Sequence, residues 1–273
     1  MRWLVRFGYD GTGFDGWARQ PGRRTVEGEI LRGLGRPGSR PDASGEVSGI
    51  EVASRTDRGV SARANALGLR AEMSPVTLLR RLNGISPEIF FTAITEIPAE
   101  FRVRGAIRRI YRYFDPVPPQ DRSRWTDGAA LFSGTIDVRS FGRGIPSGTP
   151  RRMTVESVTV ARWGPGNVIE IRAPSFVWGM VRKVVGALRE HDRGRLTLAG
   201  LRAAVEGRER LTLPMAEPEG LVLWNVEYAV PWDSYWTGPN RHQASFLESA
   251  RKGMQVRAAV LDTVSELAGP SRE

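Results

Sequence analysis

The sequence predicts an α+β fold with mostly antiparallel sheets. Stretches with the period of a strand alternate with stretches with the period of a helix. The order strand, helix, strand, strand, helix, strand occurs over residues 2–97 and again, more loosely, over 106–229. This βαββαβ order is that of ferredoxin-like and RNA-recognition domains. We therefore expect two pseudo-repeated halves, residues 1–104 and 105–273, whose sheets form a central cleft.

The first half shows the clearer of the two patterns. Residues 2–9 are a strand candidate that ends at the turn-forming pair Asp10 and Gly11. Thr25 has the chemistry of a helix N-cap and Gly35 that of a helix stop, which predicts a helix over 25–34. The other elements expected here are extended segments at 50–54 and 66–71 around a polar loop, a helix over 75–83 that begins with Pro75, and a strand over 88–97.

The second half is expected to follow the same order with a C-terminal helical extension. Its predicted elements are a strand over 106–114, a helix over 121–133, a hairpin of 153–163 with 167–173, a helix over 176–190 and a strand over 220–229. Loops rich in Gly, Pro and Ser are expected at 36–49 and 142–151. A linker over 231–240 leads to an amphipathic helix over about 241–268, which could pad the core, meet a second subunit or touch RNA.

Composition limits the chemistry. Hydrophobic residues make up 40% and charged residues 26%, which is a soluble globular composition. No apolar run is long enough to cross a bilayer and no signal peptide opens the chain, so we expect no membrane association. The absence of cysteine agrees with a reducing cytoplasm and excludes thiolate nucleophiles and cysteine-bound metals. With only two histidines, we expect no metal site.

The charge balance favours a polyanionic partner. The net charge is +10, and the only lysines are Lys183 and Lys252, so nearly all of the positive charge is guanidinium. Arginine forks bind phosphate oxygens bidentately and stack on flat bases, which suits nucleic acid. The alternative is a general preference for arginine on the surface.

One polar loop carries a candidate catalytic carboxylate. In the segment Ser54 to Ala62, SRTDRGVSA, Asp57 lies between Arg55 and Arg58. Neighbouring cations favour an ionised carboxylate, the form that a nucleophile or general base needs. The residues alone leave a second interpretation open, an Asx turn in which Asp57 caps backbone amides.

Seven segments, in order from about residue 3 to 229, resemble the tRNA pseudouridine synthase A (TruA) family. The loop RTDRGVSA is similar to the family signature R-T-D-x-G-V-x-A. The other similar segments are 8–20 (GYDGTGFDGWARQ), 25–31 (TVEGEIL), 82–88 (LNGISPE), 101–113 (FRVRGAIRRIYRY), 175–188 (SFVWGMVRKVVGAL) and 214–223 (PMAEPEGLVL).

The resemblance implies roles for individual residues. It makes Asp57 the catalytic carboxylate, Arg182 its basic partner and Tyr111 the ring that stacks on the target base. On a helical wheel Arg182 lies off the apolar face, in a stripe with Trp178 and Arg189 that is either solvated or the wall of a cleft. Substrate or RNA contacts are further expected from Arg55, Arg58, Tyr111, Arg19 and Arg109.

The resemblance also implies the activity. It indicates an isomerase that converts uridine to pseudouridine in the anticodon stem-loop of tRNA, around positions 38–40, as a cytoplasmic homodimer without cofactor or metal. Asp57 would attack C1′, add to uracil C6 or remove a sugar proton. A non-catalytic RNA-binding protein of the same fold is the main alternative. A carboxylate hydrolase is a second one, but it needs a paired acid, and none is evident near Asp57 in the sequence.

Overall fold

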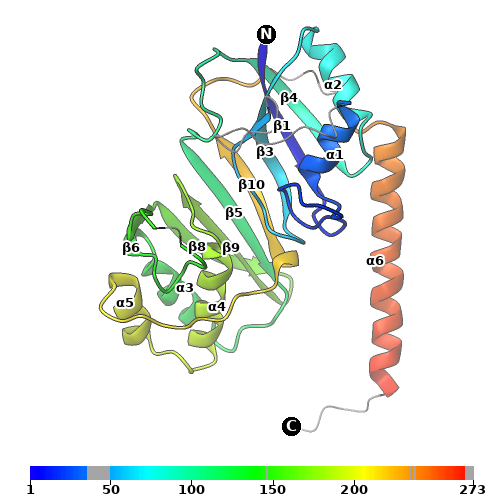
Figure 1. Cartoon of the computed structure of the whole chain (residues 1–273). Coiled ribbons are helices and arrows are strands. Elements are labelled where there is room, and N and C mark those ends of the chain that lie inside the picture. The colour runs from blue at the N-terminus through cyan, green and yellow to red at the C-terminus, as the bar shows by residue number, and fades with distance from the viewer. Residues whose placement is uncertain (36–49, 146, 234, 236–237, 268–273) are drawn as a thin grey trace.

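The computed structural model of the chain describes residues 1–35, 50–145, 147–233, 235 and 238–267. Within these residues the fold is α+β, with one large and mostly antiparallel sheet and six α-helices. The sheet crosses the middle of the molecule in the strand order β4-β1-β3-β10-β5-β9-β8, and β2 pairs with one end of β3 (Figure 1). Helices α1 and α2 lie beside the N-terminal strands, and α3, α4 and α5 lie beside the C-terminal ones.

The N-terminal elements follow the predicted order. They are β1 (Arg2–Tyr9), α1 (Val26–Gly33), β2 (Ile50–Val52), β3 (Ser61–Arg70), α2 (Pro75–Asn83) and β4 (Ile89–Glu96). Thr25 caps α1 by accepting a hydrogen bond from the N–H of Gly28, as its side chain predicts. The strand expected at 66–71 begins earlier, at Ser61, because pairing with β1 continues to Ala62. The predicted loop at 36–49 lies outside the described residues.

The C-terminal elements depart from expectation in four places. They are β5 (Arg108–Asp115), α3 (Arg122–Ala130), β6 (Gly134–Asp137), β7 (Arg152–Val155), β8 (Ser157–Trp163), β9 (Gly166–Ala173), α4 (Met180–Asp192), α5 (Leu198–Glu206) and β10 (Leu221–Glu227). The strand expected over 153–163 is two strands, because β7 pairs with β6 whereas β8 pairs with β9. The helix expected from residue 176 begins at Met180, because Gly179 has a left-handed φ of 76°. Strand β6 and helix α5 were not predicted.

Strand β10 joins the two parts of the sheet. It pairs parallel with β3 and antiparallel with β5, whereas the other strand pairings are antiparallel. Its parallel partners are Ser61 and Ala62, which directly follow the Asp57 loop. The candidate catalytic loop therefore lies at the seam where N-terminal and C-terminal strands meet.

Helix α6 (Arg241–Leu267) stands apart from the rest of the molecule (Figure 1). Its first turn is anchored, because the fully buried Gln243 amide donates to Asn83 Oδ1 and to the carbonyl oxygen of Ile89, both at 2.9 Å. Side chains further along, such as Met254 and Val260, are more than half exposed. Over its described side chains, α6 therefore pads the core only at its start. No helix among the described residues has the length and apolar character to cross a membrane.

Candidate active site

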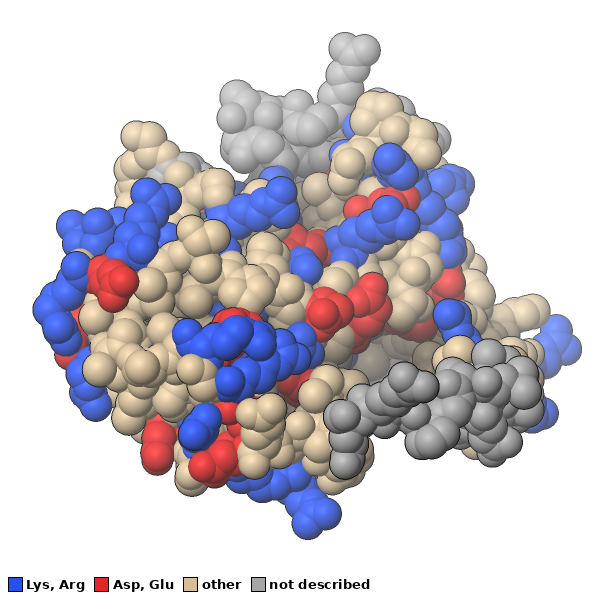
Figure 2. All heavy atoms as spheres, turned by 90° about the horizontal axis from the view of Figure 1, so that it is seen from below, with Lys and Arg blue, Asp and Glu red and all other residues tan. Residues whose placement is uncertain are grey.

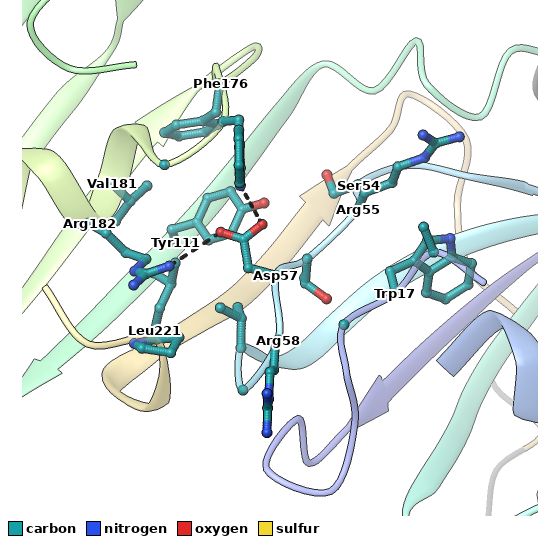
Figure 3. A pocket seen from close by; sticks show the side chains of 18 of the residues that line it. Trp17, Ser54, Arg55, Asp57, Arg58, Tyr111, Phe176, Val181, Arg182 and Leu221 are labelled. Atoms are coloured by element: carbon teal, nitrogen blue, oxygen red, sulfur yellow. Dashed lines mark hydrogen bonds and ion pairs between the residues drawn. The ribbon is translucent and has the colours of Figure 1, made fainter. Parts of the chain in front are cut away.

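A cavity of about 1110 Å³ opens at the seam between the two parts of the sheet. Its wall includes the loop 53–60, the segment 15–18, β5 and the start of α4. Figure 3 shows Asp57 in the middle of this space, with Arg182 approaching from one side and Tyr111 behind it. The structure thus brings together three side chains that are far apart in the sequence.

The end of β1 and the turn that follows it hold the Asp57 loop in place. Tyr9 Oη and Thr56 Oγ1 share a hydrogen bond of 2.7 Å, and the N–H of Trp17 donates to the carbonyl oxygen of Thr56 at 3.0 Å. Gly11 lies so close to the loop that an added Cβ would be 2.2 Å from the carbonyl oxygen of Val60. These contacts show that the segment 9–17 supports the loop that carries Asp57.

The Asp57 carboxylate has a different partner on each oxygen. Trp178 donates its indole N–H to Oδ1 at 2.7 Å, and Arg182 Nη1 lies 3.5 Å from Oδ2. The Asp57 side chain is 30% exposed and that of Arg182 is 16% exposed. Asp57 therefore faces the cavity while its partners stand at the wall, and the predicted pairing of Asp57 with Arg182 is present in the structure.

Arg182 has hydrogen-bond partners besides the Asp57 carboxylate. Its Nε donates to the carbonyl oxygen of Ala216 at 2.6 Å, and the N–H of Ala216 returns a hydrogen bond to the carbonyl oxygen of Arg182 at 3.0 Å. Of the stripe predicted on the helix over 176–190, Trp178, which precedes α4, and Arg182 line the cavity, whereas Arg189 bonds the fully buried Asp115 at 2.8 Å. The stripe is a cleft wall only over its first part.

The two arginines next to Asp57 in sequence do not pair with it. Arg58 points away and makes an ion pair of 3.3 Å with Asp15 (Figure 3). Arg55 is exposed and also points away from the carboxylate. Both line the cavity, which leaves their guanidinium groups placed to meet a ligand that enters it. The cation that holds Asp57 comes instead from α4.

Tyr111 forms part of the cavity wall from β5. Its ring is 8% exposed and meets Phe176 edge-on, with the ring centroids 4.9 Å apart. The pKa of the Tyr111 hydroxyl is raised to about 12, mainly by burial; the hydrogen bond with Ser54 and the charge of Arg109 lower this pKa, and the charge of Asp57 raises it. Tyr111 therefore keeps its proton at physiological pH, which leaves a neutral ring beside the carboxylate.

Arg109 has a structural position that the sequence did not reveal. It is 8% exposed and donates to Ser54 Oγ at 3.1 Å and to the carbonyl oxygens of Ala53 at 3.1 Å, Arg104 at 2.7 Å and Pro174. Its guanidinium thus connects Ala53 and Ser54, at the start of the loop that carries Asp57, with β5 and Pro174 of the C-terminal part. These contacts give Arg109 a positioning role, and its expected contact with RNA stays a prediction.

Arg19 lies beside the cavity rather than in its wall. Its backbone N–H donates to Glu27 Oε2 at 2.8 Å, and its sequence neighbours Ala18 and Gln20 are lining residues.

Sequence reasoning missed the bond from Trp178 to Asp57, although the stripe with Arg182 was the signal that could have found it. It also missed Asp15 and Glu219, two further carboxylates in the cavity wall.

Charge is distributed unevenly around the molecule. On the face seen in Figure 2, arginine and lysine side chains gather in several clusters with acidic side chains between them. Cavity-lining cations come from Arg23, Arg104 and the residues already named.

Within the described residues, no group of three or more His, Asp or Glu side chains is placed to hold a metal ion.

Comparison with known proteins gives one consistent family. Residues 129–229 match the family described as tRNA pseudouridine synthase. A relative from Thermococcus onnurineus, named tRNA pseudouridine synthase A, is 39% identical over 231 residues, which is 84% of this chain and 85% of the relative. Relatives of the same name from Pyrococcus furiosus (36% over 234 residues, 84% of each chain) and Methanosphaerula palustris (34% over 266 residues, 96% of this chain and 91% of the relative) agree. The chain therefore belongs to the tRNA pseudouridine synthase family.

Proposed function

We propose that the chain isomerises uridine to pseudouridine in the anticodon stem-loop of tRNA, around positions 38–40, with Asp57 as the catalytic carboxylate. The reaction breaks the bond from C1′ to N1, turns the uracil and forms a bond from C1′ to C5; C5 releases its proton and N1 takes up a proton. Atoms balance without an oxidant or a second substrate. A carboxylate that faces a cavity next to a guanidinium and an aromatic ring is the chemistry such a step needs.

The observation that carries the proposal is the environment of Asp57. Its carboxylate reaches into a cavity of about 1110 Å³, with one oxygen on Trp178 and the other near Arg182. The neutral ring of Tyr111 lies beside it and can support a base turned out of the RNA stack. An Asx turn that only caps backbone amides would not need a guanidinium and an indole N–H on the carboxylate.

The two-halves organisation is part of the proposal. We assign residues 1–104 and 105–273 to two ferredoxin-like pseudo-repeats. What supports this is the strand order, which is β4-β1-β3-β2 in the first half and β10-β5-β9-β8 in the second. If only the strands of the large sheet are counted, which leaves out β6 and β7, both halves have the order fourth, first, third and second strand. The homodimer and the cytoplasmic location stay predictions. Sedimentation of the free protein tests the homodimer.

Tritium release from tRNA labelled at uridine C5 tests the reaction. We expect tritium release with the natural protein, because C5 loses its hydrogen when it forms the bond to C1′. Mapping the modified positions should then give sites around 38–40. Modification elsewhere in the tRNA would contradict the assigned location while leaving the chemistry in place. Tight tRNA binding without release from any tRNA would favour the non-catalytic RNA-binding alternative.

The affinity for tRNA is expected to fall steeply with salt. The net charge of +10 is almost wholly guanidinium, and each phosphate contact releases counterions, so the log–log slope should be roughly one unit per contact. Filter binding between low and physiological salt measures the slope. The Arg55→Gln variant should reduce it by about one unit. A flat salt response would refute the phosphate-contact part of the proposal.

A further inference from the structure

The two oxygens of the Asp57 carboxylate are held unequally. The Trp178 indole N–H is a donor only, and its distance of 2.7 Å to Oδ1 is that of a strong hydrogen bond. Arg182 reaches Oδ2 at 3.5 Å, which is the outer limit for such a bond. Oδ1 is thus committed to the indole, and Oδ2 is the oxygen more available to a substrate.

This arrangement keeps Asp57 out of the pairing that arginine and a carboxylate prefer. Free guanidinium and carboxylate groups form a bidentate pair with two parallel hydrogen bonds. Here Arg182 Nε is committed to the carbonyl oxygen of Ala216 at 2.6 Å, and Trp178 occupies Oδ1. The carboxylate is therefore oriented without being locked to the guanidinium.

Trp178 is itself braced from the side away from Asp57. Its carbonyl oxygen accepts from the N–H of Arg143 at 2.9 Å, and the Arg143 guanidinium lies 4.9 Å from the centre of the indole ring. Gly144 lies against the same ring, because a Cβ there would be 3.5 Å from two ring atoms. Trp178 nevertheless stays 51% exposed. The ring is therefore held in place by the loop after β6 rather than by burial in the core.

We propose that Trp178 is a positioning residue for the reaction, whose indole N–H sets the orientation of the Asp57 carboxylate and leaves Oδ2 to react. The inference rests on the catalytic role proposed for Asp57. The backbone of Asp57 belongs to the N-terminal half, whereas Trp178 and Arg182 both come from one short segment of the C-terminal half. The working geometry of the carboxylate thus depends on how the two halves are packed.

Two variants separate the N–H from the ring. Trp178→Phe keeps an aromatic ring under Arg143 and removes the donor, whereas Trp178→Ala removes both. Because a hydrogen bond to a charged group is lost in each, we expect both to slow single-turnover tritium release by about 10- to 100-fold. The Kd for tRNA should stay within about twofold in Trp178→Phe. Trp163→Phe, a change of an equally exposed tryptophan on β8, is the matched control and should behave like the natural protein.

Other results would overturn the inference. A natural rate in Trp178→Phe with a slow Trp178→Ala would show that the ring matters and the N–H does not. A weaker Kd in Trp178→Phe with an unchanged single-turnover rate would make Trp178 a binding residue instead. Asp57→Ala is assayed in parallel. If it keeps its turnover, the role proposed for Asp57 fails and this inference fails with it, whereas an inactive Asp57→Ala beside an unaffected Trp178→Phe refutes the positioning role alone.

Discussion

Replacement of Asp57 by alanine is expected to lower pseudouridine formation by about a thousandfold or more while tRNA affinity changes less than about threefold. The rate falls because the variant loses the only group proposed to start the reaction, and loss of such a group removes most of the rate enhancement. The affinity persists because phosphate contacts made by arginines carry most of it. Single-turnover tritium release and filter binding on the same preparation measure the two effects.

Asp15 supplies the matched control for this prediction. It is a second carboxylate of the same cavity, but it pairs with Arg58 at 3.3 Å and lies near Arg23 at 3.9 Å. Asp15→Asn should therefore retain turnover within about tenfold, since it loses a partly exposed ion pair and no reacting group. Equal loss of activity in Asp15→Asn and Asp57→Asn would instead indicate paired acids, as in a hydrolase.

Local chemistry made most of the elements predictable. Thr25 and Ser74 cap their helices with side-chain oxygens, and residues 2–9 form a largely buried strand that ends before the turn-forming pair Asp10 and Gly11. The remaining element boundaries depend on which strands pair with one another. The division of 153–163 into β7 and β8 depends on β6, a strand of four residues whose own sequence gives little signal. Where a boundary is set by a distant partner, the sequence pattern alone cannot locate it.

The sequence predicted part of the set of residues at the cavity but few of their contacts. The motif placed Asp57 opposite Arg182, and the structure has that pair at 3.5 Å. It could not show that Arg55 and Arg58 turn away, because sequence neighbours in a loop project in different directions. The sequence motif also could not show which of two neighbouring arginines on a strand faces the solvent and which faces the interior. Arg108 and Arg109 are such a pair.

Arg109→Met is expected to lower the free energy of unfolding by about 3–5 kcal/mol. The buried guanidinium bonds Ser54 Oγ and three carbonyl oxygens, and the variant leaves these acceptors buried without their donor. Because two of the acceptors, in Ala53 and Ser54, begin the loop that carries Asp57, turnover should fall as well. Urea unfolding followed by circular dichroism measures the stability.

Arg108→Met is the control on the opposite face of the same strand. The Arg108 side chain is 34% exposed and forms ion pairs with Glu156 at 3.0 Å and Glu227 at 3.5 Å, so its loss should cost less than about 1 kcal/mol. If Arg109→Met proved as stable as Arg108→Met yet bound tRNA more weakly, Arg109 would be an RNA contact after all. A large loss of stability confined to Arg109→Met would mean that one buried guanidinium holds the loop that carries Asp57 against the C-terminal strands.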